Sequence, residues 1–194
     1  MRDLSYRIGP PVAILPPASA ALAGVVVRLF TDNKPYWCDG SLWLDLSTDR
    51  RLATARATAD VINNTTTLAN VSGLAIALDA NSTYAIDARV MFQTAATTTG
   101  IRLSQTVPAG ATVVAQWNTP TSLSASTASN QRAADTGAAS TAIDVANANT
   151  RATGSLIVIT SATAGSLQIR FASEVAGSNA VIKAGSNLVA TKVP

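Results

Sequence analysis

Residues 82–93 constrain the fold of this chain more than any other stretch, because polar and apolar side chains alternate along it. With a period of two residues, one face is apolar and carries Tyr84, Ile86, Ala88, Val90 and Phe92. The other face is mostly polar and includes Asp87 and Arg89. Successive side chains of a β-strand point to opposite faces, so this pattern predicts a long strand with one buried face. Such a strand belongs in the middle of a sheet, where it sets the register of its neighbours.

The composition favours strands and association with other copies of the chain. Only 13% of the 194 residues are charged, against about 25% in ordinary soluble domains. Thr and Val, which favour strands, and Ser and Asn, which favour turns, are abundant instead. Because scattered charges normally keep a surface soluble, we expect part of this surface to be buried between subunits. The net charge is +3, and the cluster of Arg50, Arg51 and Arg56 is interpreted as a solvated turn rather than a contact for an acidic partner.

The sequence offers little chemistry for catalysis or for binding a cofactor. It has no histidine and one cysteine, Cys38, which excludes a Ser-His-Asp or Cys-His set, a zinc tetrahedron and an intrachain disulfide. Phosphate-binding glycine motifs are absent too. A pair of carboxylates working as in a glycosidase stays open, but acids such as Asp39 and Asp79 fall in expected turns. We therefore expect no enzyme, no cofactor and no metal.

Targeting and membrane signals are weak. Arg2 and Arg7 precede an apolar stretch as in a secretory signal, but prolines interrupt that stretch. No run approaches the roughly 20 apolar residues of a membrane span, and no long run of Lys or Arg occurs. We expect neither a membrane nor a nucleic acid as partner.

Residues 1–24 are predicted to form an extended arm, because two Pro-Pro pairs forbid helix across them. The arm is either a loose terminus or an anchor that becomes ordered on a partner. Its apolar side chains favour the anchor, and the candidate docking residues are Ile8, Val12, Ile14, Leu15 and Leu22.

Residues 25–51 are predicted to form a small β-meander that ends in a polar joint over residues 47–51. Asp39-Gly40 is a strong hairpin signal between two of its short strands. Trp37 and Trp43 fall in this unit, either in a core or interface or as a platform for sugar.

Residues 52–194 read as an all-β domain with many short strands, which is typical of a sandwich or barrel. Residues 118–139 are rich in Ser, Thr and Ala, and form either a disordered segment or an excursion over a neighbouring subunit. The strands are expected over residues 57–61, 66–68, 74–78, 82–93, 101–106, 112–117, 140–145, 150–159, 165–171, 181–183 and 188–193.

The order of several short motifs resembles small β-sandwich modules in virion proteins of tailed bacteriophages. The motifs are residues 64–68 (Asn-Thr-Thr-Thr-Leu), 74–78 (Leu-Ala-Ile-Ala-Leu), 81–88 (Asn-Ser-Thr-Tyr-Ala-Ile-Asp-Ala), 100–103 (Gly-Ile-Arg-Leu) and 184–191 (Ala-Gly-Ser-Asn-Leu-Val-Ala-Thr). The resemblance covers roughly residues 57 to 193. It implies a jelly-roll sandwich that assembles as a trimer, as in tumour-necrosis-factor heads, and it carries over no catalytic residue. It also implies a role as a capsid decoration protein, a head fibre or the tip of a tail fibre.

The sequence thus predicts a jelly-roll β-sandwich preceded by a small meander and a Pro-rich arm. Its expected function is that of a homotrimeric decoration or cement protein on the outer surface of a phage capsid, docked through its N-terminal region on the major capsid protein or another virion protein. The lack of a shaft that would carry a head away from the particle favours this reading. One alternative is a receptor- or glycan-binding head of a tail fibre or spike, in which Trp37, Trp43 and Trp117 stack on a host surface glycan. The least favoured alternative is an enzyme that degrades surface polysaccharide.

Overall fold

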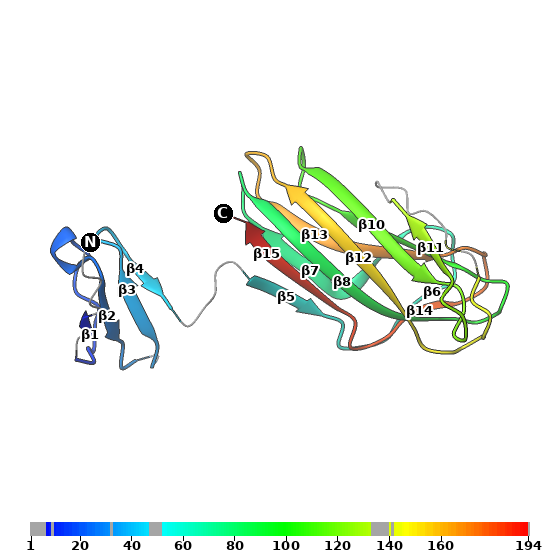
Figure 1. The fold of residues 1–194 in the computed structure, drawn as a ribbon, viewed down its shortest axis with the longest axis horizontal. Coiled ribbons are helices and arrows are strands. Elements are labelled where there is room, and N and C mark those ends of the chain that lie inside the picture. The colour runs from blue at the N-terminus through cyan, green and yellow to red at the C-terminus, as the bar shows by residue number, and fades with distance from the viewer. Residues whose placement is uncertain are drawn as a thin grey trace. The chain divides into compact units, whose positions relative to one another are not determined.

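The chain folds into two compact units, Met1–Arg50 and Arg51–Pro194 (Figure 1). The computed structural model describes residues 7–8, 10–31, 33–46, 52–132, 140 and 142–193. Apart from one 3-10 turn, η1 (Ala20–Leu22), the regular elements of these residues are strands, so the predicted all-β class is confirmed. In the described ranges, no helix has the length and apolar character to cross a membrane.

The small unit contains a sheet in the order β1-β2-β3-β4. Its strands are β1 (Arg7–Ile8), β2 (Val25–Arg28), β3 (Pro35–Cys38) and β4 (Trp43–Asp45). β2, β3 and β4 pair antiparallel and form the expected meander. At the Asp39-Gly40 turn, Gly40 has a φ of 100°, a conformation that glycine adopts without steric cost. The Asp39 carboxylate accepts the Leu42 and Ser41 backbone N–H groups, which lowers the pKa of Asp39.

The described part of the arm is hydrogen-bonded to this meander. β1 runs parallel to β2, and the Val12 N–H donates to the carbonyl of Arg28 at 2.9 Å. The Trp43 indole N–H donates to the carbonyl of Pro16 at 2.7 Å. Through these bonds, backbone groups of the arm pair with the meander, whereas those of a free extended segment would pair with water. Separate roles for residues 1–24 and 25–51 stay a prediction.

The large unit consists of two sheets. The larger sheet has the order β11-β10-β12-β8-β14-β6, and β15 joins β8 and carries β5 at its other edge. The smaller sheet has the order β7-β13-β9. The strands are β5 (Leu52–Arg56), β6 (Val61–Asn63), β7 (Ala69–Leu78), β8 (Thr83–Thr94), β9 (Ile101–Thr106), β10 (Thr112–Pro120), β11 (Ala128–Gln131), β12 (Thr150–Ile159), β13 (Gly165–Ser173), β14 (Ala180–Ile182) and β15 (Asn187–Val193).

The order of pairing is that of a jelly roll. The first strand, β5, pairs with the last, β15, which pairs with β8, and β8 pairs with β12. The smaller sheet shows the same pattern, because the late strand β13 lies between the earlier strands β7 and β9 and pairs with both. This wrapping of two chain halves around each other is what two interlocked Greek keys produce. It confirms the predicted β-sandwich class.

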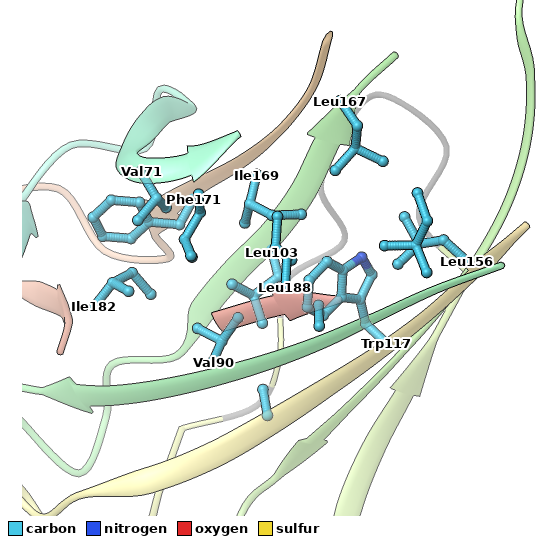
Figure 2. Close-up of a cluster of buried hydrophobic side chains, with 14 of the residues drawn as sticks. Val71, Val90, Leu103, Trp117, Leu156, Leu167, Ile169, Phe171, Ile182 and Leu188 are labelled. Carbon is cyan, nitrogen blue, oxygen red and sulfur yellow. The ribbon is translucent and has the colours of Figure 1, made fainter. Parts of the chain in front are cut away.

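β8 is the central strand of the large sheet, as the alternation in residues 82–93 predicts. It pairs with β12 on one side and with β15 and β14 on the other. Its inward side chains are buried, whereas Asp87 and Arg89 are exposed. Side chains from both sheets form one core between the layers, part of which is drawn in Figure 2. The Tyr84 hydroxyl, at the edge of this core, accepts the Asp79 N–H at 2.9 Å.

Three predicted strands are wrong, and in or beside each of these segments a polar side chain hydrogen-bonds to a loop. Residues 57–60 form a loop in which the Asp60 carboxylate accepts the Ala184 N–H at 2.9 Å. Residues 64–68 also form a loop, organised by the buried Asn63 amide, which donates to the carbonyls of Thr67 and Phe171. Short polar side chains commonly compete with the sheet in this way.

The third wrong strand, over residues 140–145, shows bends and no ladder in its described part. There the Asp144 carboxylate accepts the Ser122 hydroxyl and the Leu123 N–H, and these bonds lower the pKa of Asp144. Much of the excursion predicted over residues 118–139 is ordered, because β10 continues to Pro120 and β11 pairs with it. Residues 133–139 lie outside the described part of the chain.

Candidate functional site

The small unit exposes several large apolar side chains. Ile14 is 81% exposed and Phe30 is 67% exposed, and Leu42 and Leu46 are also on the surface. Among the described residues of this unit, only Val27 and Cys38 are buried apolar side chains. A unit with so few buried side chains and so many exposed ones has the character of an interaction surface.

The five residues predicted to dock on a capsid occupy different environments. Ile14 is the only exposed side chain among those described, whereas Val12, Leu15 and Leu22 are half-buried. The backbone of Ile8 lies in β1, and its side chain falls outside the described part of the structure. Docking by these residues stays a prediction, and Phe30, Leu42 and Leu46 extend the exposed apolar set beyond them.

The three tryptophans do not form one platform. Trp37 lies opposite Leu44 and Trp43 lies opposite Cys38 in the β3–β4 pair, so the two rings belong to opposite faces of the small sheet. Trp117 is in the large unit and is fully buried in the sandwich. Its indole N–H donates to the amide oxygen of Gln105 at 3.1 Å. No ring face of Trp117 is therefore accessible to a sugar in this structure.

A second apolar surface lies on the outer face of the large sheet and was not recognised in the sequence. We call it the apolar patch. It is made of side chains from four strands of this sheet, in two adjacent rows of the strand register: Leu52 of β5, Val114 of β10, Ile157 and Ile159 of β12, and Val193 of β15. Val114 is 67% exposed, and the small or hydroxyl side chains of Ala85 and Thr191 lie between the larger ones. Contiguous patches of this kind mark contacts more often than scattered single residues do.

The same outer face becomes polar toward the other end of the strands. Asp87 and Arg89 of β8 lie beside Gln116 and Asn118 of β10 and Thr153 of β12, around a hollow of about 410 Å³. The sequence predicted that Asp87 and Arg89 face outward, but not which neighbours join them, because that depends on the pairing register.

The described residues hold no group of three or more Cys, Asp or Glu side chains placed to bind a metal ion. The thiol of Cys38 is buried. Two ion pairs join described residues: Lys183–Asp60 links two loops, and Lys192–Asp79 links β15 to a loop. Both pairs lower the pKa of the acid, chiefly through the lysine hydrogen bond.

Comparison with known proteins finds only a distant structural likeness. No family model matches the chain. No curated protein matches its sequence. Among solved structures, it is similar to that of infectious bursal disease virus Gt strain, with a TM-score of 0.28 and 13% identity over 79% of this chain and 40% of that one. It is also similar to the VP2 subviral particle of infectious bursal disease virus, with a TM-score of 0.26 and 12% identity over 78% of this chain and 42% of that one.

The chain therefore spans about two fifths of the length of these proteins of viral particles. TM-scores below 0.3 make the likeness too weak to support an argument about function. The case for a function rests on the fold and the surfaces described above.

Proposed function

We propose that this protein is a structural component of a virion, a homotrimeric decoration or cement protein on the outer surface of a tailed-bacteriophage capsid. The small unit docks on the major capsid protein or another virion protein, and the sandwich stands outward. The proposal assigns the chain no catalytic role. The observation that carries it is the exposure of Ile14, Phe30, Leu42 and Leu46 on a unit with few buried side chains. Docking would remove this apolar surface from water, at a gain of roughly 25 cal/mol per Å².

The sandwich supports the proposal through its fold and through the apolar patch. The jelly-roll pairing agrees with the sequence resemblance to phage virion modules. In a closed trimer each copy presents one surface to the next, and the apolar patch is our candidate for one half of that contact. Many copies on one particle multiply contacts that are individually weak.

Particle binding tests the docking step. The full chain is mixed with phage particles that lack it, and bound copies are counted after sedimentation. Ile14→Asp should abolish co-sedimentation, because it places a charge in the docking surface, and the 81% exposure of Ile14 makes a folding defect unexpected. The matched control is Ile62→Asp, which is 63% exposed on the sandwich and should bind normally. Equal binding of both variants would refute docking through the small unit. A copy number that matches the symmetry of the tail would assign the protein to the tail and contradict a place on the capsid.

The mass in solution tests the trimer. Light scattering should give three times the 19.8 kDa of one chain. Val114→Asp should lower that mass, because it introduces a charge into the apolar patch, whereas Thr54→Asp on the polar end of the same face should leave it unchanged. A wild-type mass equal to one chain would rule out the trimer.

A further inference from the structure

We propose that the polar end of the outer face of the large sheet binds an acidic polysaccharide, a function separate from docking and from trimer formation. The inference begins with the register. Six side chains, one from each of six neighbouring strands, lie directly opposite one another and form a single row, in the order Arg56, Asn187, Arg89, Thr153, Asn118 and Asn130. We call this the polar row. With strands roughly 4.8 Å apart, it runs about 24 Å across the sheet.

The polar row passes through two hollows. One, of about 410 Å³, lies over β8, β12, β10 and β11 and is lined by Arg89, Thr153 and Asn118. The other, of about 480 Å³, lies over β5 and β15 and is lined by Arg56 and Asn187. Both are open and shallow, and together they follow the row across the strands. That shape suits an extended polymer lying on the sheet better than a small molecule enclosed in a pocket.

The side chains of the first hollow have unused hydrogen-bonding capacity. Asn118 donates to Asn130 at 2.7 Å. Within the described structure, Asp87, Arg89 and Gln116 make no side-chain hydrogen bond, and neither do Thr153 and Ser155 on the same floor. Guanidinium, amide, carboxylate and hydroxyl groups together offer both donors and acceptors. Vicinal hydroxyls of a sugar need this mixture.

The charge on this face indicates that the polysaccharide is acidic. Arg56, Arg89 and Arg151 all point outward, and no described residue forms an ion pair with them. Asp87 is the single acid in the six strands of the row, all of which are described. The excess of positive charge attracts an anion, and the planar fork of an arginine matches a carboxylate through two hydrogen bonds.

Nucleic acid is the less favoured anion. Proteins that hold single-stranded nucleic acid stack its bases on aromatic side chains. In the six strands of the row, all of which are described, the aromatic residues Tyr84, Phe92 and Trp117 are buried in the core. A face of arginines, amides and hydroxyls without a stacking platform fits a sugar acid better than a base.

The test measures binding of the full-length protein to a polyuronate by calorimetry, with dextran as the neutral polymer and poly-dT as the nucleic acid. Polyuronate should bind, and dextran and poly-dT should bind at least about tenfold more weakly. Arg89→Gln should weaken polyuronate binding about tenfold, as expected for loss of a charged hydrogen bond. Arg28→Gln, which removes an exposed arginine of the small unit, is the matched control and should bind like the wild type. Melting curves confirm that each variant is folded.

A second variant separates a built site from simple charge attraction. Gln116→Ala leaves the charge unchanged and removes an exposed amide from the hollow. It should weaken polyuronate binding about fivefold, because one hydrogen bond is lost. Three results would each overturn the proposal: no binding of polyuronate by the wild type, equal binding by Arg89→Gln, or poly-dT bound as tightly as polyuronate. These measurements use no phage particle, so they stand apart from the docking experiment.

Discussion

At the scale of single residues, Trp117 leaves no room for a side chain at Gly154 in the core. The two residues lie directly opposite each other in the β10–β12 pair, and both face inward. A Cβ atom on residue 154 would lie 2.8 Å from the Trp117 ring. We predict that Gly154→Ala lowers the free energy of unfolding by about 1–3 kcal/mol, as overpacking of a filled core does. Urea denaturation followed by circular dichroism measures the change.

The control for this prediction is Ser155→Ala, on the outward face of the same strand, which should leave the unfolding midpoint nearly unchanged. Combining Gly154→Ala with Trp117→Phe should cost less than the sum of the two single changes, because the smaller ring leaves room for the methyl group. Strict additivity would mean that the two residues do not clash.

The face of the sheet to which a side chain points could be predicted from the sequence only where polar residues identify the outward side. In residues 82–93, Asp87 and Arg89 identify the solvent face, and the opposite set is buried as expected. The faces are less clear before Trp117, because Val113, Val114 and Ala115 place apolar side chains on both of them, so the sequence left Trp117 open as a surface aromatic. The buried amide of Asn63 was missed as well, since its partners, Thr67 and Phe171, depend on loop geometry.

At the scale of elements, Asp60 and Lys183 hold the β5–β6 loop against the turn between β14 and β15. The Asp60 carboxylate accepts hydrogen bonds from the Lys183 ammonium and the Ala184 N–H, and the lysine contact is the main reason that its pKa lies below the ordinary value. A carboxyl group whose pKa is lowered by folding stabilises the fold above its unfolded pKa of about 3.9, and this contribution disappears as the pH falls through the lowered value.

We therefore predict that Asp60→Asn lowers the melting temperature at pH 7, and that its difference from the wild type narrows as the pH falls below about 4. Thermal melts between pH 7 and pH 2 measure this difference. Asp87→Asn, which changes an exposed acid without an ion pair, is the control and should follow the wild type. A difference that stays constant over the whole range would show that the ionised carboxylate is not the stabilising group.

The elements that the sequence predicted best are those with a clear period of two. Residues 150–159 and 165–171 alternate and appear as β12 and β13. Thr-rich and Asp-containing segments, such as residues 66–68 and 140–145, have the composition of strands but no alternation. In their described residues these segments form loops instead. The polar row could not be predicted at all, because it needs the register of six strands that are far apart in the sequence. Arg56, interpreted as part of a solvated turn, is a member of that row.

At the scale of the whole molecule, the two units differ in the number of apolar side chains that they bury. The sandwich has an extended cluster of buried apolar side chains, whereas the described residues of the small unit bury only Val27 and Cys38. Units of this size with so little buried surface are marginal without a partner. We predict that the small unit unfolds at a lower denaturant concentration than the sandwich.

Tryptophan fluorescence distinguishes the two transitions, because Trp37 and Trp43 report on the small unit and Trp117 reports on the sandwich. In a Trp117→Phe variant, the fluorescence of Trp37 and Trp43 should change at low urea, because it reports on the small unit. Circular dichroism should show the unfolding of the sandwich at higher urea. A variant with both Trp37→Phe and Trp43→Phe should show the late transition alone. Addition of particles that carry the docking partner should raise the first midpoint, since a partner that binds only the folded unit stabilises it. A single midpoint shared by all three tryptophans would mean that the small unit depends on the sandwich for its stability.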